Sequence, residues 1–446
     1  MIDNPTAIWT ATDASADRLV IDGNRIDALL GPGEEPASPV DARFDATGLV
    51  VLPGLVNCHH HFYQTLTRAF PAALNQPLFP WLQSLYPIWA GLRAESIEVS
   101  TRLALAELML SGCTLASDHH YVFPQGLDAA IDNQARVAGE LGVRVALTRG
   151  SMSLGEDQGG LPPQSVVQTE VQILDDSTRL LDEVHDGAAD SMCRVALAPC
   201  SPFSVTESLM RESAALAREH GARLHTHLAE TEDENTFCVE HYGRRPLDLL
   251  ADLDWLADDV WLAHGIHFDD AEIARLGAAG VAISHCPSSN MLLASGQCPV
   301  LDLEAAGCPV GLGVDGSASS DASNLMQEIR QAFLLQRLNY GAERVTHDVA
   351  LAWATRGGAR TLGWDRLGVI EPGALADLAL FDLDELRFSG HGDPIAALVL
   401  CGAHRVRWLM VNGHWCVQNG EVPDLDLGAL RAAHAAEAGR LAAVAG

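Results

Sequence analysis

Short apolar runs bounded by glycine, proline or polar residues recur through the middle of the chain, and segments with the period of amphipathic helices separate them. The eight runs are residues 49–56, 114–117, 143–148, 195–198, 223–227, 260–264, 281–285 and 310–313. Strands of this length that alternate with helices are typical of βα units around a parallel sheet. Eight consecutive units predict an α/β fold, a closed (β/α)8 barrel of the TIM type.

Hairpin signals lie at both ends of the chain. Strand patterns occur at residues 17–24, 378–381 and 405–411, and the last is followed by the turn dipeptide Asn412-Gly413. We therefore predict a small β-sandwich domain built from both termini. The predicted boundaries are 1–57 and 366–426 for the β-sandwich domain, 58–365 for the barrel and 427–446 for an alanine-rich helical tail.

The composition narrows the class of partner. The 446 residues are 48% hydrophobic and carry a formal charge of −31, which would repel phosphate backbones and anionic membranes. We expect a small-molecule substrate and neither nucleic acid nor membrane as a partner. No apolar run reaches the ~18 residues of a membrane span, and the N-terminus lacks a secretory signal pattern, so we expect a cytoplasmic protein.

The cysteines and the basic residues exclude several chemistries. The ten cysteines contain no CxxC pair, which favours reduced, mostly buried thiols over a disulfide scaffold or a zinc ribbon. All 28 basic residues are arginine. The absence of lysine excludes Schiff-base, P-loop and lysine-bridged two-metal chemistry.

Histidines and carboxylates follow four of the predicted strands. They are His59 and His61 after the first, His225, His227 and Glu230 after the fifth, His264 at the sixth and Asp315 after the eighth. Residues i and i+2 of an extended strand point the same way, so His59 and His61 can share one ion while His60 faces elsewhere. The C-terminal ends of barrel strands meet at one face. A loop of incidental histidines does not explain four separate elements, so we predict a metal site there.

The residue types indicate which metal this site would hold. Imidazole nitrogens with one carboxylate suit Zn²⁺ best, and Fe²⁺ is the less favoured alternative. Such an ion lowers the pKa of a bound water towards neutrality, which is typical of hydrolytic enzymes.

These motifs resemble the amidohydrolase superfamily over nearly the whole chain. The matching segments are Pro53-Gly54-Leu55-Val56-Asn57 before His59 and His61, His227 with Glu230, His264, and Leu312-Gly313-Val314-Asp315-Gly316. The resemblance implies a barrel with a β-sandwich from both chain ends. Relatives with two metals bridge them through a carboxylated lysine or a fourth-strand Glu, whereas this chain has no lysine and ends that strand in Ala198-Pro199-Cys200. The one-metal aminohydrolase branch, with one zinc per chain, is therefore implied.

Carried over residue by residue, the resemblance implies roles for the clustered side chains. The implied metal ligands are His59, His61, His227 and Asp315, with His225 as a support. Asp315 would accept a proton from the attacking water, and His264 would orient that water and stabilise the tetrahedral intermediate. Glu230 would protonate the ring nitrogen and help the amine leave. A second interpretation of Glu230 stays open, namely the start of a solvated acidic helix in residues 230–234.

Three positions bear on the substrate within this branch. Gln64 follows His61 by three residues, where guanine deaminases of the family carry a Gln that reads the base edge. Trp89 stands where nucleoside deaminases carry a Glu for the ribose hydroxyls, and Cys200 replaces a His of their fourth-strand motif. An indole in place of a ribose acceptor favours a free base. A packing role for Trp89 or Cys200 stays open.

Residues 59–69 and 85–90 resemble the 8-oxoguanine deaminases, which convert 8-oxoguanine to urate and ammonia. Isocytosine carries the same 2-amino lactam face. The predicted function is therefore hydrolytic deamination of a free 2-amino lactam base. The alternatives are an s-triazine hydrolase, an adenosine or S-adenosylhomocysteine deaminase, and a non-catalytic metal-binding scaffold.

Three further side chains are candidates for substrate binding. Arg149 either fixes a lactam oxygen or pairs with an acid such as Glu156, and the sequence favours neither. His119 and Tyr121, beside Asp118 at the second strand end, are predicted pocket residues, with packing as the alternative.

Two further segments have open roles. The residues around His285 and Asn290 are expected near the mouth of the pocket. The apolar segment 79–89 could serve the pocket or a dimer contact, and we expect a homo-oligomer.

Overall fold

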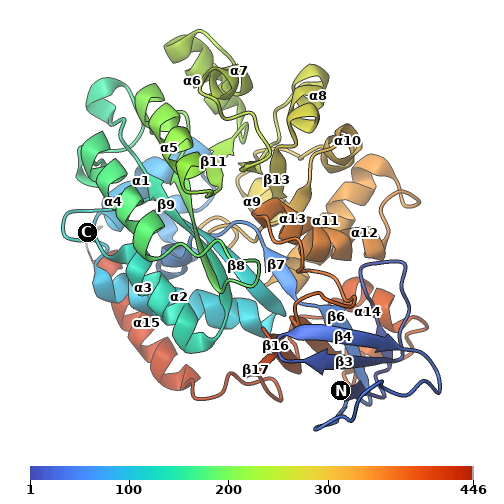
Figure 1. Cartoon of the computed structure of the whole chain (residues 1–446). Helices are drawn as coiled ribbons and strands as arrows, with labels where there is room; N and C mark the ends of the chain where they lie inside the picture. Colours follow the sequence, from blue (N-terminus) through green and yellow to red (C-terminus); the bar gives the residue numbers. More distant parts are fainter. Residues whose placement is uncertain (444–446) are drawn as a thin grey trace.

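Eight parallel strands close into a barrel at the centre of the molecule (Figure 1). This computed structural model describes residues 1–443 of the chain. The barrel strands are β7 (Leu55–Asn57), β8 (Cys113–His120), β9 (Arg144–Ser151), β10 (Cys193–Pro199), β11 (Leu224–Leu228), β12 (Val260–His264), β13 (Ala282–His285) and β14 (Val310–Leu312). They pair in sequence order, and β14 closes the barrel onto β7. The predicted α/β barrel is confirmed.

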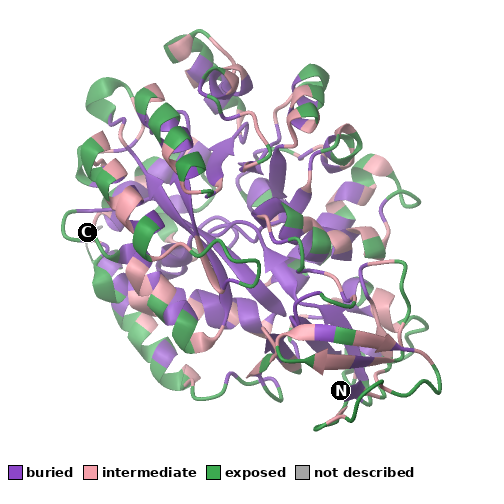
Figure 2. Cartoon of the chain, in the orientation of Figure 1, coloured by how far each residue is buried: buried purple, intermediate pink, exposed green. Residues whose placement is uncertain are grey.

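Helices surround the barrel, with buried faces towards the strands and exposed faces outward (Figure 2). They are α1 (Leu78–Trp89), α2 (Ala94–Leu110), α3 (Ala130–Leu141), α4 (Glu170–Glu183), α5 (Glu207–Glu219), α6 (Glu232–Tyr242), α7 (Pro246–Asp252), α8 (Asp270–Ala279), α9 (Pro287–Leu292), α10 (Val300–Ala306), α11 (Leu325–Tyr340), α12 (His347–Ala352), α13 (Gly358–Leu362) and α14 (Pro394–Leu400).

Helix α5 shows why these segments are helical. The Thr206 hydroxyl caps it by accepting the N–H of Leu209, and buried residues recur four positions apart at Leu209, Ser213 and Ala217. Within residues 1–443, none of the helices is both long and apolar enough to span a membrane.

The predicted first strand, residues 49–56, is wrong in one respect, because it forms two strands. β6 (Leu49–Pro53) joins a sheet of the terminal domain and β7 joins the barrel. The break falls at Gly54, where a Cβ atom would lie 2.1 Å from the hydroxyl oxygen of Thr114. Only glycine permits this close approach. The apolar pattern hides the break because both strands are fully buried.

The two chain ends together form two further sheets. One has the order β4-β3-β1-β5 and the other the order β17-β16-β15-β6-β2. Their strands are β1 (Ile2–Asp3), β2 (Ala7–Ile8), β3 (Arg18–Asp22), β4 (Arg25–Leu30), β5 (Phe44–Asp45), β15 (Leu378–Asp382), β16 (Trp408–Val411) and β17 (His414–Val417).

Alternation along β15 attaches this β-sandwich to the barrel. Leu378 and Leu380 pack with Leu19 between the two sheets, whereas Ala379 and Phe381 belong to the core shared with the barrel. The domain boundaries themselves stay a prediction.

Helix α15 (Leu427–Ala442) covers the loop that follows β7. It packs on α2 and on the short helix η1 (Phe62–Thr67). Glu437 accepts hydrogen bonds from Arg93 at 2.9 and 3.1 Å, and the His434 ring lies 3.1 Å from the Thr65 hydroxyl. The helical tail therefore holds the segment that carries Gln64. Residues 444–446 of the predicted tail lie outside the described residues.

Candidate active site

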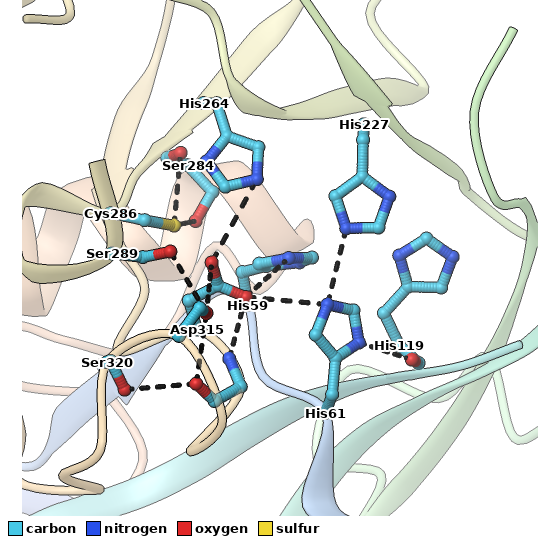
Figure 3. A network of polar contacts seen from close by, with 12 residues as sticks. His59, His61, His119, His227, His264, Ser284, Cys286, Ser289, Asp315 and Ser320 are labelled. Carbon is cyan, nitrogen blue, oxygen red and sulfur yellow. Dashed lines mark hydrogen bonds and ion pairs between the residues drawn. The ribbon is translucent and has the colours of Figure 1, made fainter. Parts of the chain in front are cut away.

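The side chains predicted at the strand ends meet at one end of the barrel (Figure 3). The Nε2 atoms of His61 and His227 lie 3.2 Å apart. Asp315 Oδ1 lies 3.3 Å from Nε2 of His59 and 3.4 Å from Nε2 of His61. All four side chains are buried. Three ring nitrogens and one carboxylate oxygen therefore surround a single small volume.

Backbone carbonyls fix which ring nitrogens of His61 and His227 face this volume. The Nδ1–H of His61 donates to the carbonyl of His119 at 2.6 Å, and the Nδ1–H of His227 donates to the carbonyl of Cys200 at 2.7 Å. A carbonyl only accepts, so the proton sits on Nδ1 and Nε2 keeps its lone pair. Outer hydrogen bonds of this kind orient metal-binding histidines.

His225 gives the same support to His59. The Nδ1–H of His225 donates to the carbonyl of Trp261 at 2.8 Å, so its Nε2 accepts the Nδ1–H of His59 at 2.9 Å. The rings of His225 and Trp261 stack with their centroids 4.3 Å apart. The lone pair of His59 Nε2 is thereby directed at Asp315.

His264 and Glu230 stand beside this donor cluster. Nε2 of His264 lies 3.4 Å from Glu230 Oε2 and 4.0 Å from Asp315 Oδ2. Its Nδ1–H donates to the amide oxygen of Asn290 on α9 at 3.0 Å. Asn290 therefore sets the orientation of His264. The sequence predicts only that Asn290 lies near the mouth of the pocket and does not predict this contact.

A cavity opens beside these groups and reaches α1. Its polar lining consists of His61, Gln64, Tyr121, Cys200, His227, Glu230, His264, Asp315 and Ser319. Its remaining lining consists of Leu78, Trp81, Leu82, Tyr86, Phe203 and Leu293. Of the predicted substrate-binding residues, Gln64, Tyr121 and Cys200 line this cavity.

Trp89 does not line the cavity, which corrects the predicted wall. Its ring packs edge-on against Tyr63 with the centroids 5.3 Å apart, and its indole N–H donates to the Thr67 hydroxyl at 3.2 Å. Trp81 and Tyr86 face the cavity instead. The docking of α1 turns residues 78, 82 and 86, which share one helical face, towards the site.

Arg149 also points away from the cavity and does not pair with Glu156. Its Nε–H donates to Asp176 at 2.6 Å, one NH₂ group donates to Gln168 at 2.9 Å, and the guanidinium lies 3.8 Å above the Phe123 ring. A buried arginine requires such acceptors, so Arg149 stabilises the link between β9 and α4.

His119 and Asp118 lie behind the site rather than on its wall. The His119 ring stacks on His227 with the centroids 4.6 Å apart. The Asp118 carboxylate accepts the N–H of Phe62 at 2.5 Å and the side-chain N–H of Gln134 at 2.6 Å, so it anchors η1.

The sequence of this chain is similar to that of a known protein family. The Amidohydrolase family matches residues 50–416. The chain belongs to the amidohydrolase family.

Several relatives of this amidohydrolase have named activities. It is 60% identical to the 8-oxoguanine deaminase of Pseudomonas aeruginosa, over 99% of both chains. It is 37% identical to the 5-methylthioadenosine/S-adenosylhomocysteine deaminase of Natronomonas pharaonis, over 92% of this chain and 91% of the relative. The zinc-complexed atrazine chlorohydrolase of Arthrobacter aurescens TC1 has a TM-score of 0.92 and 32% identity, and the match covers 99% of each chain.

The donor set of this amidohydrolase fits a divalent metal ion. Burial lowers the pKa of His59, His61 and His227, so the rings are neutral. Burial alone would raise the pKa of Asp315, but the adjacent His264, whose own pKa is raised, lowers it and favours the ionised carboxylate. The ring nitrogens of these histidines carry lone pairs that face the ionised Asp315 carboxylate in the protein interior. The lone pairs and the carboxylate repel one another unless a cation lies between them. Nitrogen and oxygen donors in this number are typical of zinc and related ions.

The acid beside the metal site is held by a residue that the sequence interpretation missed. Both carboxylate oxygens of Glu234 accept backbone hydrogen bonds, from Ala229 at 3.0 Å and from Glu230 at 3.1 Å. Glu230 and Glu234 are buried, so the solvated acidic helix start holds only for Glu232 and Asp233, which are exposed. Burial raises the pKa of Glu230 to about 7. The acidic run thus contains Glu230, whose pKa lies near neutrality, and Glu234, which fixes the backbone that carries Glu230.

Proposed function

We propose that this protein hydrolytically deaminates a free 2-amino lactam base, with 8-oxoguanine converted to urate and ammonia and isocytosine as a second substrate. The observation that carries the proposal is the cavity in which Glu230 and His264 face the metal-donor cluster. The 60% identity to an 8-oxoguanine deaminase over 99% of both chains supports the same substrate.

We propose one zinc ion per chain, held by His59, His61, His227 and Asp315. Three imidazoles with one carboxylate suit zinc, and a solved relative is complexed with zinc. The absence of lysine and the Pro199-Cys200 end of β10 support a single ion. When bound, the ion supplies a nucleophile at neutral pH by lowering the pKa of water.

Three side chains of the cavity would handle the protons. Asp315, which is ionised, accepts a proton from the attacking water. Burial alone would lower the pKa of His264, but the neighbouring Glu230 and Asp315 raise it by more, so the pKa lies above its usual value. Its Nε2–H can therefore stabilise an oxyanion at the attacked carbon. Glu230, with its pKa raised to about 7, can hold a proton and donate it to the ring nitrogen. The proton that Asp315 accepted from the water then passes to the leaving amine, which departs as ammonia, and the hydroxyl proton of the intermediate returns to Glu230 as the carbonyl forms.

The rest of the cavity supports a free base. The Gln64 carbonyl oxygen accepts the backbone N–H of Ala318 at 3.4 Å, which leaves the amide NH₂ to donate to the base. Leu82 and Phe203 provide apolar walls for a flat ring. Among the described residues, Glu230 and Asp315 are the only carboxylates of the lining, so no further acid is present to bind ribose hydroxyls.

An ammonia-release panel on metal-quantified protein tests the substrate. We expect turnover of 8-oxoguanine and isocytosine, and little or none of guanine, melamine and S-adenosylhomocysteine. Activity confined to a nucleoside or a triazine would overturn the proposal in favour of the corresponding alternative. More than one equivalent of tightly held metal would contradict the one-zinc site, and metal binding without any turnover would indicate a scaffold.

The variant Glu230→Gln tests the proton donor. It should retain the metal and lose about 10²- to 10⁴-fold in turnover, the usual contribution of general acid–base catalysis. Near-normal turnover would overturn the assignment.

A further inference from the structure

His119 contributes a ring nitrogen to the donor cluster from a strand that the proposed ligand set does not use. It lies near the end of β8 and is completely buried, and Figure 3 shows it beside His61 and His227. Its ring centroid lies 4.8 Å from that of His225 and 4.6 Å from that of His227. The His119 ring therefore packs directly against two histidines of the site.

The hydrogen bond of His119 determines its tautomer. Its Nε2–H donates to the carbonyl of Ala198 at 3.0 Å. Because a carbonyl only accepts, the proton is on Nε2 and Nδ1 carries a lone pair. This Nδ1 has no hydrogen-bond partner among residues 1–443. A buried nitrogen of this kind is costly unless a donor or a cation meets its lone pair.

His119 also lies close enough to three other histidines to be considered as a ligand. One ligand atom from each of His59, His61, His119 and His227 lies within 4.8 Å of the others. Two nitrogens bound to one zinc ion at ~2.1 Å each are at most ~4.2 Å apart. To bind the same ion, the His119 ring therefore has to move by up to ~0.6 Å and turn out of its stack with His227.

We propose that His119 is a further metal ligand, which binds through Nδ1 and gives the ion four imidazoles together with the Asp315 carboxylate. This inference rests on the metal site of the proposed function. The backbone carbonyl of His119 already holds His61 at 2.6 Å, so strand β8 supports the ion through both its main chain and its side chain.

X-ray absorption of the zinc-loaded wild-type protein tests the proposal directly. The outer-shell scattering of bound imidazole rings should give a count of four. A count of three would overturn the proposal, and this measurement needs no variant that has to fold.

The variant His119→Phe tests the same assignment by affinity. Phenylalanine keeps a ring on His227 and leaves the backbone carbonyl for His61 in place, but removes the nitrogen. We expect a zinc dissociation constant at least ~10-fold higher and, with cobalt in place of zinc, stronger visible absorption because the ion loses one ligand and its coordination number falls.

His120→Phe is the matched control. His120 is the next residue of β8, is equally buried, and lies outside both donor groups, so its loss should leave zinc affinity and the cobalt spectrum unchanged. Unchanged affinity and an unchanged cobalt spectrum in folded His119→Phe would overturn the proposal. The ammonia panel is read separately, so four imidazoles in a protein that does not release ammonia would refute the deaminase and leave the ligand assignment intact.

Discussion

Replacing Asn290 with alanine is expected to slow the reaction without releasing the metal. The Asn290 amide oxygen accepts the Nδ1–H of His264 at 3.0 Å, and this bond turns Nε2 towards Glu230 and Asp315. Asn290 is itself buried and lies outside the donor groups. In Asn290→Ala, the buried N–H loses its acceptor while every proposed metal ligand remains.

The magnitude follows from the loss of this single hydrogen bond. A hydrogen bond to a charged group contributes about 1.5–3 kcal/mol, which corresponds to about a 10- to 150-fold loss in kcat/KM if it is realised in the transition state. The pH dependence should change as well. Asn290 is among the groups that raise the pKa of His264, so its removal lowers that pKa. The protonated ring is then lost at lower pH, and the alkaline limb of kcat/KM moves to lower pH.

Ammonia release from 8-oxoguanine, measured across pH with the metal content of each sample, is the assay. Asn290→Asp keeps an acceptor and adds a charge, so its alkaline limb should move to higher pH. Asn235→Ala is the matched control, because this buried amide donates to Glu232 at 3.0 Å on α6 and does not contact His264. Unchanged kcat/KM and an unshifted limb in Asn290→Ala would refute the role given to this contact.

Three other perturbations probe the anchor, the far end of the cavity and the ion. Glu234→Ala leaves the N–H groups of Ala229 and Glu230 unpaired at about 1–3 kcal/mol each, so kcat should fall ~100-fold as Glu230 moves. Normal kcat would contradict the anchor. The buried Tyr86 hydroxyl has no hydrogen-bond partner within the described chain, so it is free to bind the C8 oxygen, which lies opposite the amino group of the purine. Isocytosine lacks this oxygen, so Tyr86→Phe should lower kcat/KM for 8-oxoguanine but not for isocytosine. Equal losses for the two substrates would refute this orientation. Chelation should abolish turnover and lower Tm, since the ion binds only the folded state; an unchanged Tm in metal-free protein would contradict a structural contribution from the ion.

The strand pattern predicted the barrel well, and its errors are the break at Gly54 inside an apolar run and the strands that polar residues continue. The predicted range 260–264 matches β12, whereas the predicted 114–117 stops three residues before β8 ends at His120. Asp118 and His119 remain in the strand because Gln134 donates to the Asp118 carboxylate and the Ala198 carbonyl accepts the Nε2–H of His119. Such partners come from other strands and helices, so a local pattern of polarity does not reveal them.

The sequence by itself determined the chemical character of the site. Parallel barrel strands bring their C-terminal ends to one face whatever the details of packing, so the positions of His59, His61, His227 and Asp315 were sufficient to predict a common cluster. Their chemistry, three imidazoles and a carboxylate without any lysine, belongs to the residue types alone.

Only the tertiary structure decided which way the remaining side chains face. The docking of α1 places Tyr86 at the cavity and Trp89 behind it. Arg149 points away from the site because it donates a hydrogen bond to Asp176 on α4. The tautomer of His119 depends on the Ala198 carbonyl of β10, a strand that is separated from β8 by β9. These outcomes depend on contacts between residues distant in the sequence, and the periodicity of a single helix or strand contains no information about them.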